Sequence, residues 1–169
     1  MKELEYPFDD AYIIKKRKSL KKALLADGTS RIRKKIAVFG GSTTSDIVKT
    51  LELFLLDAGI EPEFYESEYA QYFQDAMFPD ETLLSFKPDI VFIHTTNRNV
   101  TDWPEMTDTT EQIDEKLHTE INRFTAMWKS IAEKFHCPII QNNFECRFTA
   151  CSAAATRGTS TATRISSRA

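Results

Sequence analysis

The sequence is short of cysteine and histidine, and it lacks a long apolar run. Its three cysteines are an odd number without metal-ligand spacing, so we expect a reducing, cytoplasmic environment and no bound metal. No apolar run approaches the roughly 20 residues that span a bilayer. Residues 1–7 lack the apolar core of a signal peptide. We therefore expect no membrane partner.

Acidic residues are missing from the C-terminal end of the chain. Residues 147–169 contain four arginines and no acid, whereas residues 1–146 hold 18 basic and all 25 acidic residues, a net charge of −7. An acidic folded part argues against nucleic-acid binding, and we expect none. Hydrophobic residues make up 41% of the chain and charged residues 28%, as in an ordinary globular domain.

The same C-terminal segment changes in composition. Six Ala, five Thr, four Ser and four Arg dominate residues 147–169, which therefore hold too little apolar surface to form a packed core. A low-complexity linker is one interpretation. We favour another, that the segment is an out-of-frame translation of the continuing gene and is disordered. On that interpretation the domain before it is truncated.

The N-terminal segment predicts an amphipathic helix over 8–25, with an apolar stripe and a basic opposite face. A solvated basic face is the favoured interpretation, and a surface for a membrane or an acidic partner is the alternative. We expect three parts in the chain: a helical extension over 1–30, an α/β domain over 31–146, and the tail over 147–169.

Short β-branched and aromatic runs alternate with helical patterns in the middle of the chain. Strands are expected over 35–39, with a start near Ile32, and over 62–65, 90–93 and 137–141. Helices are expected over 45–58, 79–86 and 111–135, with a near-helical aromatic segment over 69–78. Gly59 is expected to end the first of these helices. The β-α-β-α-β-α-β order predicts an α/β fold, a three-layer sandwich around a parallel, flavodoxin-like sheet.

Each predicted strand ends in polar residues. The first runs through two glycines into Ser42, a pattern that predicts a tight turn with free backbone N–H groups. The other strands end at 66–67, 94–97 and 141–143. Because the carboxyl ends of parallel strands share one edge, these residues predict one candidate site centred on Ser42. The turn is no Walker motif, so its signal for phosphate is weak.

Several uncommon strings carry a family resemblance. They lie at residues 40–44, 63–68, 74–78, 88–99 and 135–145. There the sequence resembles the N-terminal domain of FkbH-like proteins, in which an SGNH/GDSL-hydrolase-like domain precedes a HAD-type phosphatase-like domain. The resemblance implies an SGNH-like sheet, incomplete here at its C-terminus. It also implies a parent protein that acts in polyketide-type biosynthesis. Some members of the family transfer a glyceryl unit onto a carrier protein.

The SGNH pattern is matched in part. By resemblance, Ser42 takes the position of the nucleophile, although Gly41 stands where the family has Asp. Asn97 matches the asparagine that helps form the oxyanion hole, and on residues alone it could instead cap a turn. Ala70 is the nearest counterpart of a further family glycine. The Asp-x-x-His that supplies the catalytic base is absent, as is the Asp-x-Asp of the HAD domain.

A serine nucleophile needs a base, and histidine is the usual one. His94 ends a central strand near Asn97 and is our candidate, although a hydrogen-bonded structural histidine is the favoured alternative. His118 is expected on a helix surface. His136 is expected at the opposite end of the sheet. None of the three forms an Asp-x-x-His pair.

Five further residues are expected to contact the ligand. Arg98 could bind a phosphate or carboxylate of the ligand, and a surface ion pair is an equally favoured role for it. The others are Gly41, Thr43, Thr44 and Asn142.

Together these observations predict a domain that binds an acyl or glyceryl group or a carrier protein and is inactive alone. One alternative is a serine ester or thioester hydrolase of SGNH type. Another is a non-enzymatic domain that docks an acyl-carrier protein through the basic face of the first helix. We expect no cofactor, and a HAD domain in the parent protein.

Overall fold

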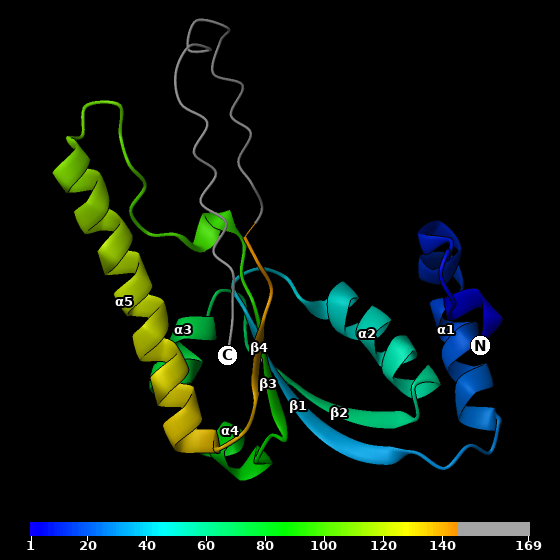
Figure 1. Cartoon of the computed structure of the whole chain (residues 1–169). Coiled ribbons are helices and arrows are strands. Elements are labelled where there is room, and N and C mark those ends of the chain that lie inside the picture. The colour runs from blue at the N-terminus through cyan, green and yellow to red at the C-terminus, as the bar shows by residue number, and fades with distance from the viewer. Residues whose placement is uncertain (145–169) are drawn as a thin grey trace, which may run out of the picture.

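The computed structural model describes residues 1–144 (Figure 1). In chain order the elements are η1 (Lys2–Leu4), α1 (Asp10–Ala26), β1 (Ile32–Gly40), α2 (Ser45–Asp57), β2 (Ile60–Glu66), α3 (Tyr72–Met77), α4 (Glu81–Phe86), β3 (Ile90–His94), η2 (Asn97–Asn99), α5 (Thr110–Phe135) and β4 (Ile139–Gln141). The predictions for the tail and for the incomplete C-terminal edge fall on or beyond residue 145. They lie outside the described residues and stay predictions.

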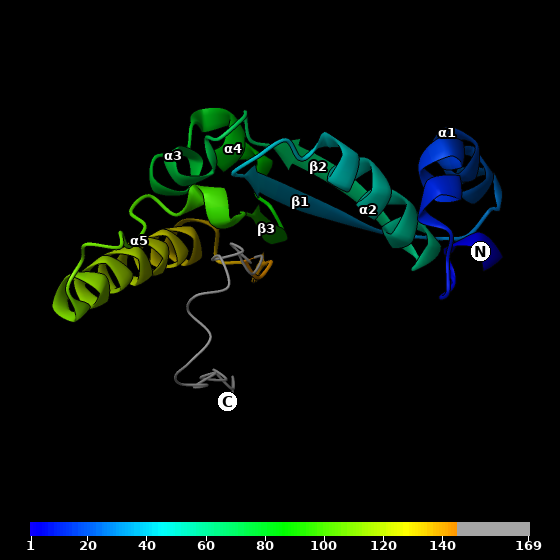
Figure 2. The ribbon, with the colours of Figure 1, turned by 90° about the horizontal axis from the view of Figure 1, so that it is seen from above.

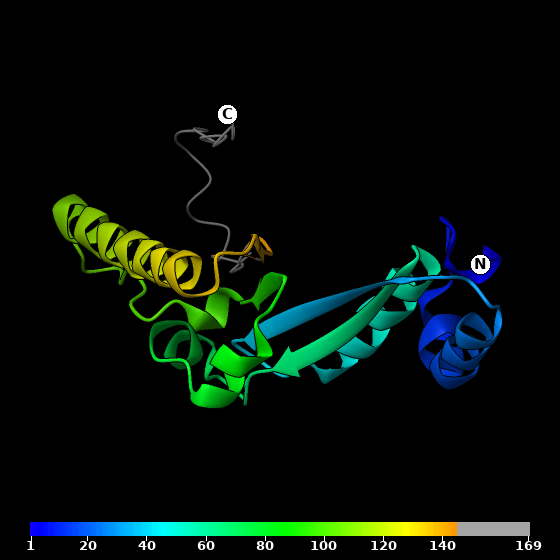
Figure 3. The ribbon, with the colours of Figure 1, turned by 90° about the horizontal axis from the view of Figure 1, so that it is seen from below.

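The four strands form one parallel sheet in the order β2-β1-β3-β4. Helices flank this sheet, which lies between α2 and α5 in Figure 1. Seen from above and from below, α1 and α2 lie toward one end of the molecule and α3 and α5 toward the other (Figures 2 and 3). The predicted α/β class and parallel sheet are therefore confirmed.

The two faces of the sheet bury different side chains because residues alternate along a strand. On one face, Ala37 and Phe39 of β1 and Ile93 of β3 join a buried cluster with α3, α4 and α5. On the other face, Ile36 and Val38 pack with α2. A strand buried on both faces carries the unbroken apolar run that the sequence shows at this point.

The N-terminal extension packs on α2 rather than on the sheet. Leu20 and Leu24 of α1 share a buried cluster with Leu53 and Leu56 of α2. Ion pairs between Arg17 and Asp46 and between Lys21 and Glu52 flank this cluster. Outside the cluster, α1 presents its remaining basic residues to solvent: Lys15, Lys16, Lys18 and Lys22.

Most element boundaries agree with the sequence patterns. Gly59 adopts a positive φ of 81° just after α2, as expected of a residue that ends a helix. β1 begins at Ile32, as predicted, and its pairing with β2 starts there, opposite Ile60. The aromatic segment becomes helical only at Tyr72, since Ala70 has a positive φ of 60°.

The longest helix, α5, extends beyond its packed half. It begins at a capping box formed by Thr109 and Gln112, and 26 residues make it about 39 Å long. Its C-terminal half buries Met127 and Ile131 against the sheet, whereas Leu117 is 55% exposed. The apolar side chains of α5 are therefore only partly buried. None of the helices in residues 1–144 is long and apolar enough to cross a bilayer.

Candidate functional site

The centre of the candidate site is the turn after β1. Gly40 pairs with His94 of β3, and the Gly41 N–H donates a hydrogen bond of 2.8 Å to the His94 carbonyl oxygen. The main chain then leaves the sheet at Ser42, and α2 begins three residues later, at Ser45. Ser42 thus lies at the carboxyl edge of the two central strands, where α/β sheets collect ligands.

Asn99 holds this turn in place. Its Nδ2 donates to the Gly41 carbonyl oxygen at 2.9 Å, and its Oδ1 accepts from the Thr96 N–H at 2.8 Å. A Cβ atom on Gly41 would lie 2.5 Å from Cγ and Nδ2 of Asn99, far inside contact distance. Only glycine therefore allows the carboxamide to lie flat against the turn.

Asn99 is in turn held by a charged network from α5. Arg123 Nη2 donates to the Asn99 carbonyl oxygen at 2.7 Å and to Glu120 Oε2 at 2.8 Å. Arg123 Nη1 donates to the Tyr72 hydroxyl at 3.0 Å, and Glu120 Oε1 accepts from the N–H and the hydroxyl of Thr101. The arginine, the glutamate and the asparagine thus fix residues 99–101 against α3 and α5.

The Glu120 carboxyl titrates below its ordinary value. Burial acts to raise the pKa of Glu120, but the hydrogen bonds from Arg123 and Thr101 and the charge of Arg123 outweigh it and lower the pKa from 4.5. The folded protein therefore holds this carboxylate ionised at a pH where an unfolded chain begins to protonate it.

A second set of hydrogen bonds joins the carboxyl ends of β3 and β4. Asn142 Oδ1 accepts from the Thr95 N–H at 2.9 Å, and its Nδ2 donates to the Thr95 carbonyl oxygen at 2.7 Å. Gln141 Nε2 donates to Thr95 Oγ1 at 3.0 Å. Both polar atoms of the Asn142 side chain thus extend the sheet, and its predicted role in ligand binding stays a prediction.

Three polar side chains beside the turn keep their hydrogen-bonding capacity. Within residues 1–144, the Ser42 hydroxyl, the Asn97 carboxamide and the His94 ring make no hydrogen bond, and each residue is half-buried. The Ser67 hydroxyl, after β2, is buried and has no hydrogen-bond partner in the same range. These groups are the free donors and acceptors of the edge.

The other predicted contact residues divide by exposure. Thr43 and Arg98 are exposed, and no ion pair of Arg98 forms with residues 1–144. Thr44 is buried, and its Oγ1 donates to Glu66 Oε2 at 3.2 Å, joining the start of α2 to the end of β2. Thr44 therefore also serves the fold.

No base is hydrogen-bonded to Ser42 among the described residues. His94 lies beside Phe92, with the ring centroids 6.3 Å apart. His118 is exposed on α5, where its Nδ1 contacts the Asp114 carbonyl oxygen at 2.7 Å. His136 ends α5 at the opposite end of the sheet. No cluster of three or more His, Cys, Asp or Glu side chains suited to a metal ion occurs in residues 1–144.

The sequence patterns placed Ser42, Asn97 and His94 at one edge, and the strand register brings Gly40 and His94 together. They did not identify Asn99 or Arg123. The signal for Asn99 was a capping box, Thr96 with Asn99 three residues on, of the kind that fixes a short helical turn. Arg123 gave no signal, because Asn99 and Tyr72, the partners that connect it to the turn and to α3, are distant in sequence and only its ion pair with Glu120 is local.

No family model and no curated protein matches this chain. Among solved structures it is similar to the N-terminal part of the protein BF1531 from Bacteroides fragilis, which contains a phosphatase domain complexed with Mg. The TM-score is 0.62 and the identity 20%, over 83% of this chain and 36% of that one. The chain thus spans about a third of that structure, and the likeness shows the fold.

A second structure, ornithine transcarbamoylase from Giardia lamblia, aligns with 79% of this chain and 33% of its own at 15% identity. Its TM-score of 0.34 is too low to support any argument.

The contact between Gly41 and Asn99 predicts coupled stability effects. Gly41→Ala and Asn99→Ala should each lower the free energy of unfolding by about 1–3 kcal/mol, through overpacking and through lost hydrogen bonds. Combined, they should cost less than their sum by at least about 0.5 kcal/mol, because removing the carboxamide makes room for the new methyl group. Urea unfolding measures all three variants.

Asn97→Ala is the matched control for this cycle. Its effect should simply add to that of Gly41→Ala, since the Asn97 side chain makes no hydrogen bond in residues 1–144. If the effects of Gly41→Ala add both to those of Asn99→Ala and to those of Asn97→Ala, the contact between Gly41 and Asn99 is contradicted.

The Glu120 carboxylate predicts a loss of stability in acid. Since its pKa is lowered on folding, its contribution is complete above 4.5 and is lost as the pH falls through the folded value. Glu120→Gln should cost about 3 kcal/mol at neutral pH, since Arg123 loses its partner. It should also reduce the acid dependence of urea unfolding. Glu133→Gln, exposed on the same helix, should change neither, and an unaltered acid dependence in Glu120→Gln would refute the prediction.

Proposed function

We propose that this chain is a binding domain for an acyl or glyceryl group in a larger, FkbH-like protein. Ser42 and Asn97 contact the group, and the likeness to the N-terminal part of a protein with a phosphatase domain supports the parent architecture. The family resemblance at residues 40–44 and 88–99 supports the ligand class. In this proposal the parent's phosphatase-like domain carries the chemistry that this chain lacks.

One observation carries the proposal. At the edge where parallel sheets bind ligands, the braced turn presents the Ser42 hydroxyl, while the His94 ring ends β3 and the Asn97 carboxamide begins η2; none of the three has a hydrogen-bond partner in residues 1–144. Half-buried polar groups without a protein partner bind water, and a ligand that reproduces those hydrogen bonds can displace it. The carbonyl oxygen of an acyl group, or the carbonyl oxygen and hydroxyls of a glyceryl group, would form hydrogen bonds with Ser42 and Asn97 here.

Binding without efficient hydrolysis follows from the missing base. A serine hydroxyl becomes a strong nucleophile only when a base, itself oriented by a third group, accepts its proton. His94 is near in register, but neither Ser42 nor an acidic side chain in residues 1–144 is hydrogen-bonded to its ring. An SGNH-type hydrolase is therefore the alternative that needs an added base.

A docking domain for a carrier protein is the second candidate. The observation that favours it is the face of α1 on which four lysines stay exposed and form no ion pair within residues 1–144: Lys15, Lys16, Lys18 and Lys22. An acidic carrier would be steered to such a face. This role requires nothing of Ser42.

Ser42→Ala tests the proposal directly. The probes are the N-acetylcysteamine thioesters of butanoic and glyceric acids, with binding measured by calorimetry and turnover by thiol release. The wild type should bind one of them and release little thiol, and Ser42→Ala should weaken binding about three- to tenfold, since one hydrogen bond is lost. Ser19→Ala, a serine exposed on α1, should bind as the wild type does.

Three outcomes would contradict this proposal. Rapid thiol release that depends on Ser42 would favour a hydrolase. No thioester binding, with retained binding of an acyl-carrier protein, would favour docking. Equal thioester binding by the wild type and Ser42→Ala would remove Ser42 from the site.

A further inference from the structure

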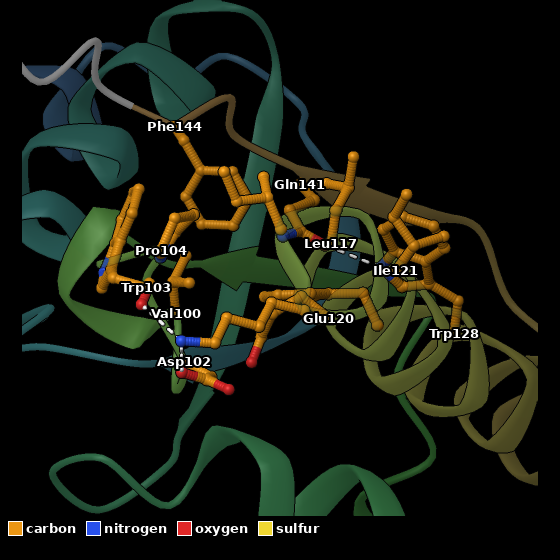
Figure 4. Close-up of a pocket in the computed structure, with 13 residues that line it drawn as sticks. Val100, Asp102, Trp103, Pro104, Leu117, Glu120, Ile121, Trp128, Gln141 and Phe144 are labelled. Atoms are coloured by element: carbon orange, nitrogen blue, oxygen red, sulfur yellow. Dashed lines mark hydrogen bonds and ion pairs between the residues drawn. The ribbon is translucent and has the colours of Figure 1, made fainter. Parts of the chain in front are cut away.

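An apolar pocket of about 410 Å³ lies between α5, the segment after η2 and the end of β4. Aromatic and aliphatic side chains line most of it, among them Val100, Trp103, Leu117, Ile121, Trp128 and Phe144. Figure 4 shows Trp103 and Trp128 at opposite ends, with Leu117 and Ile121 between them on α5. Leu117 and Ile121 are 55% and 51% exposed, so the apolar walls are open to an occupant.

The polar groups of this pocket are already paired. Lys116 Nζ lies 3.3 Å from Asp102 Oδ1 and 2.9 Å from Asp108 Oδ2, and Glu120 is bound by Arg123. Gln141 Oε1 accepts from Trp128 Nε1 at 2.7 Å, a contact drawn in Figure 4. A charged or hydroxylated occupant would lose hydration here without gaining partners, so the pocket suits an uncharged hydrocarbon group.

Two short paths join the pocket to the Ser42 turn, and each consists of one peptide bond and hydrogen bonds. Val100, in the pocket wall, directly follows Asn99, whose carboxamide holds Gly41. Gln141, in the opposite wall, donates to Thr95, which directly follows the His94 whose carbonyl oxygen binds the Gly41 N–H. The pocket therefore begins beside the edge that presents Ser42.

We propose that this pocket binds the aliphatic tail of an acyl group whose carbonyl lies at Ser42. The inference rests on the proposed function and selects a medium-length fatty acyl group over a glyceryl group, whose hydroxyls would be left unpaired among apolar walls. The two tryptophans that bound the pocket limit the length of the tail. An extended helix or strand of another protein would need a groove that is open at both ends.

The tryptophans also provide the test. The chain contains two, Trp103 and Trp128, and both line the pocket, so intrinsic fluorescence reports on it without a label. Titration with butanoyl, hexanoyl and octanoyl N-acetylcysteamine thioesters should give saturable changes. The dissociation constant should fall about two- to fourfold for each added methylene, the range for partial to full burial.

Two variants place the effect in the pocket. Leu117→Glu puts a charge on a half-exposed pocket wall and should abolish the dependence on chain length, with butanoyl binding nearly unchanged. Leu84→Glu, at a leucine of α4 that is 45% exposed, is the matched control and should keep the dependence. Circular dichroism checks that both variants fold. Chain-length dependence that survives Leu117→Glu would overturn the inference.

The remaining outcomes separate this inference from the proposed function. Binding that depends on Ser42 but not on chain length would overturn the pocket and leave the proposed function standing. Binding that depends on chain length but not on Ser42 would overturn the proposed function and the placement of the carbonyl at Ser42, and would leave only the binding of a hydrocarbon tail in the pocket. A fluorescence change on dilution without ligand, with a dimer in sedimentation, would show that a second copy covers the pocket and would overturn the inference.

Discussion

The hydrogen bond from Asn99 to the Gly41 carbonyl oxygen is the contact on which the candidate site depends. It joins the turn after β1 to the segment after β3, and Arg123 fixes that segment from α5. Without this hydrogen bond, the turn between β1 and α2 would be free to move, and Ser42 would move with it. Because Asn99 and not Asn97 makes this contact, the Asn97 carboxamide has no hydrogen-bond partner within residues 1–144.

This arrangement separates structural from functional polar groups. Three side chains form hydrogen bonds that hold the strand ends: those of Asn142, Thr44 and Asn99. The side chains of Ser42 and Asn97 have no hydrogen-bond partner in residues 1–144. Local sequence patterns do not separate these two groups, because all five are polar residues that follow strands. Their difference arises from which carbonyl and amide groups the folded strands leave within reach.

The local patterns predicted the fold well and the site in part. Strand and helix periods gave the parallel sheet, because buried runs such as residues 90–93 leave few alternatives. They also placed the start of β1 near Ile32, where its pairing with β2 begins. They missed two of the three partners of Arg123, Asn99 and Tyr72, which lie 24 and 51 positions away. Such contacts exist only after the chain has folded.

An NMR titration of the labelled chain with the octanoyl thioester tests the central claim most directly, that the braced turn is where the ligand binds. The account predicts that the backbone amide signals of Gly41, Ser42 and Asn97 shift first, together with that of Val100 at the pocket. Shifts confined to the exposed lysines of α1, with the Gly41 and Ser42 signals unchanged, would contradict it.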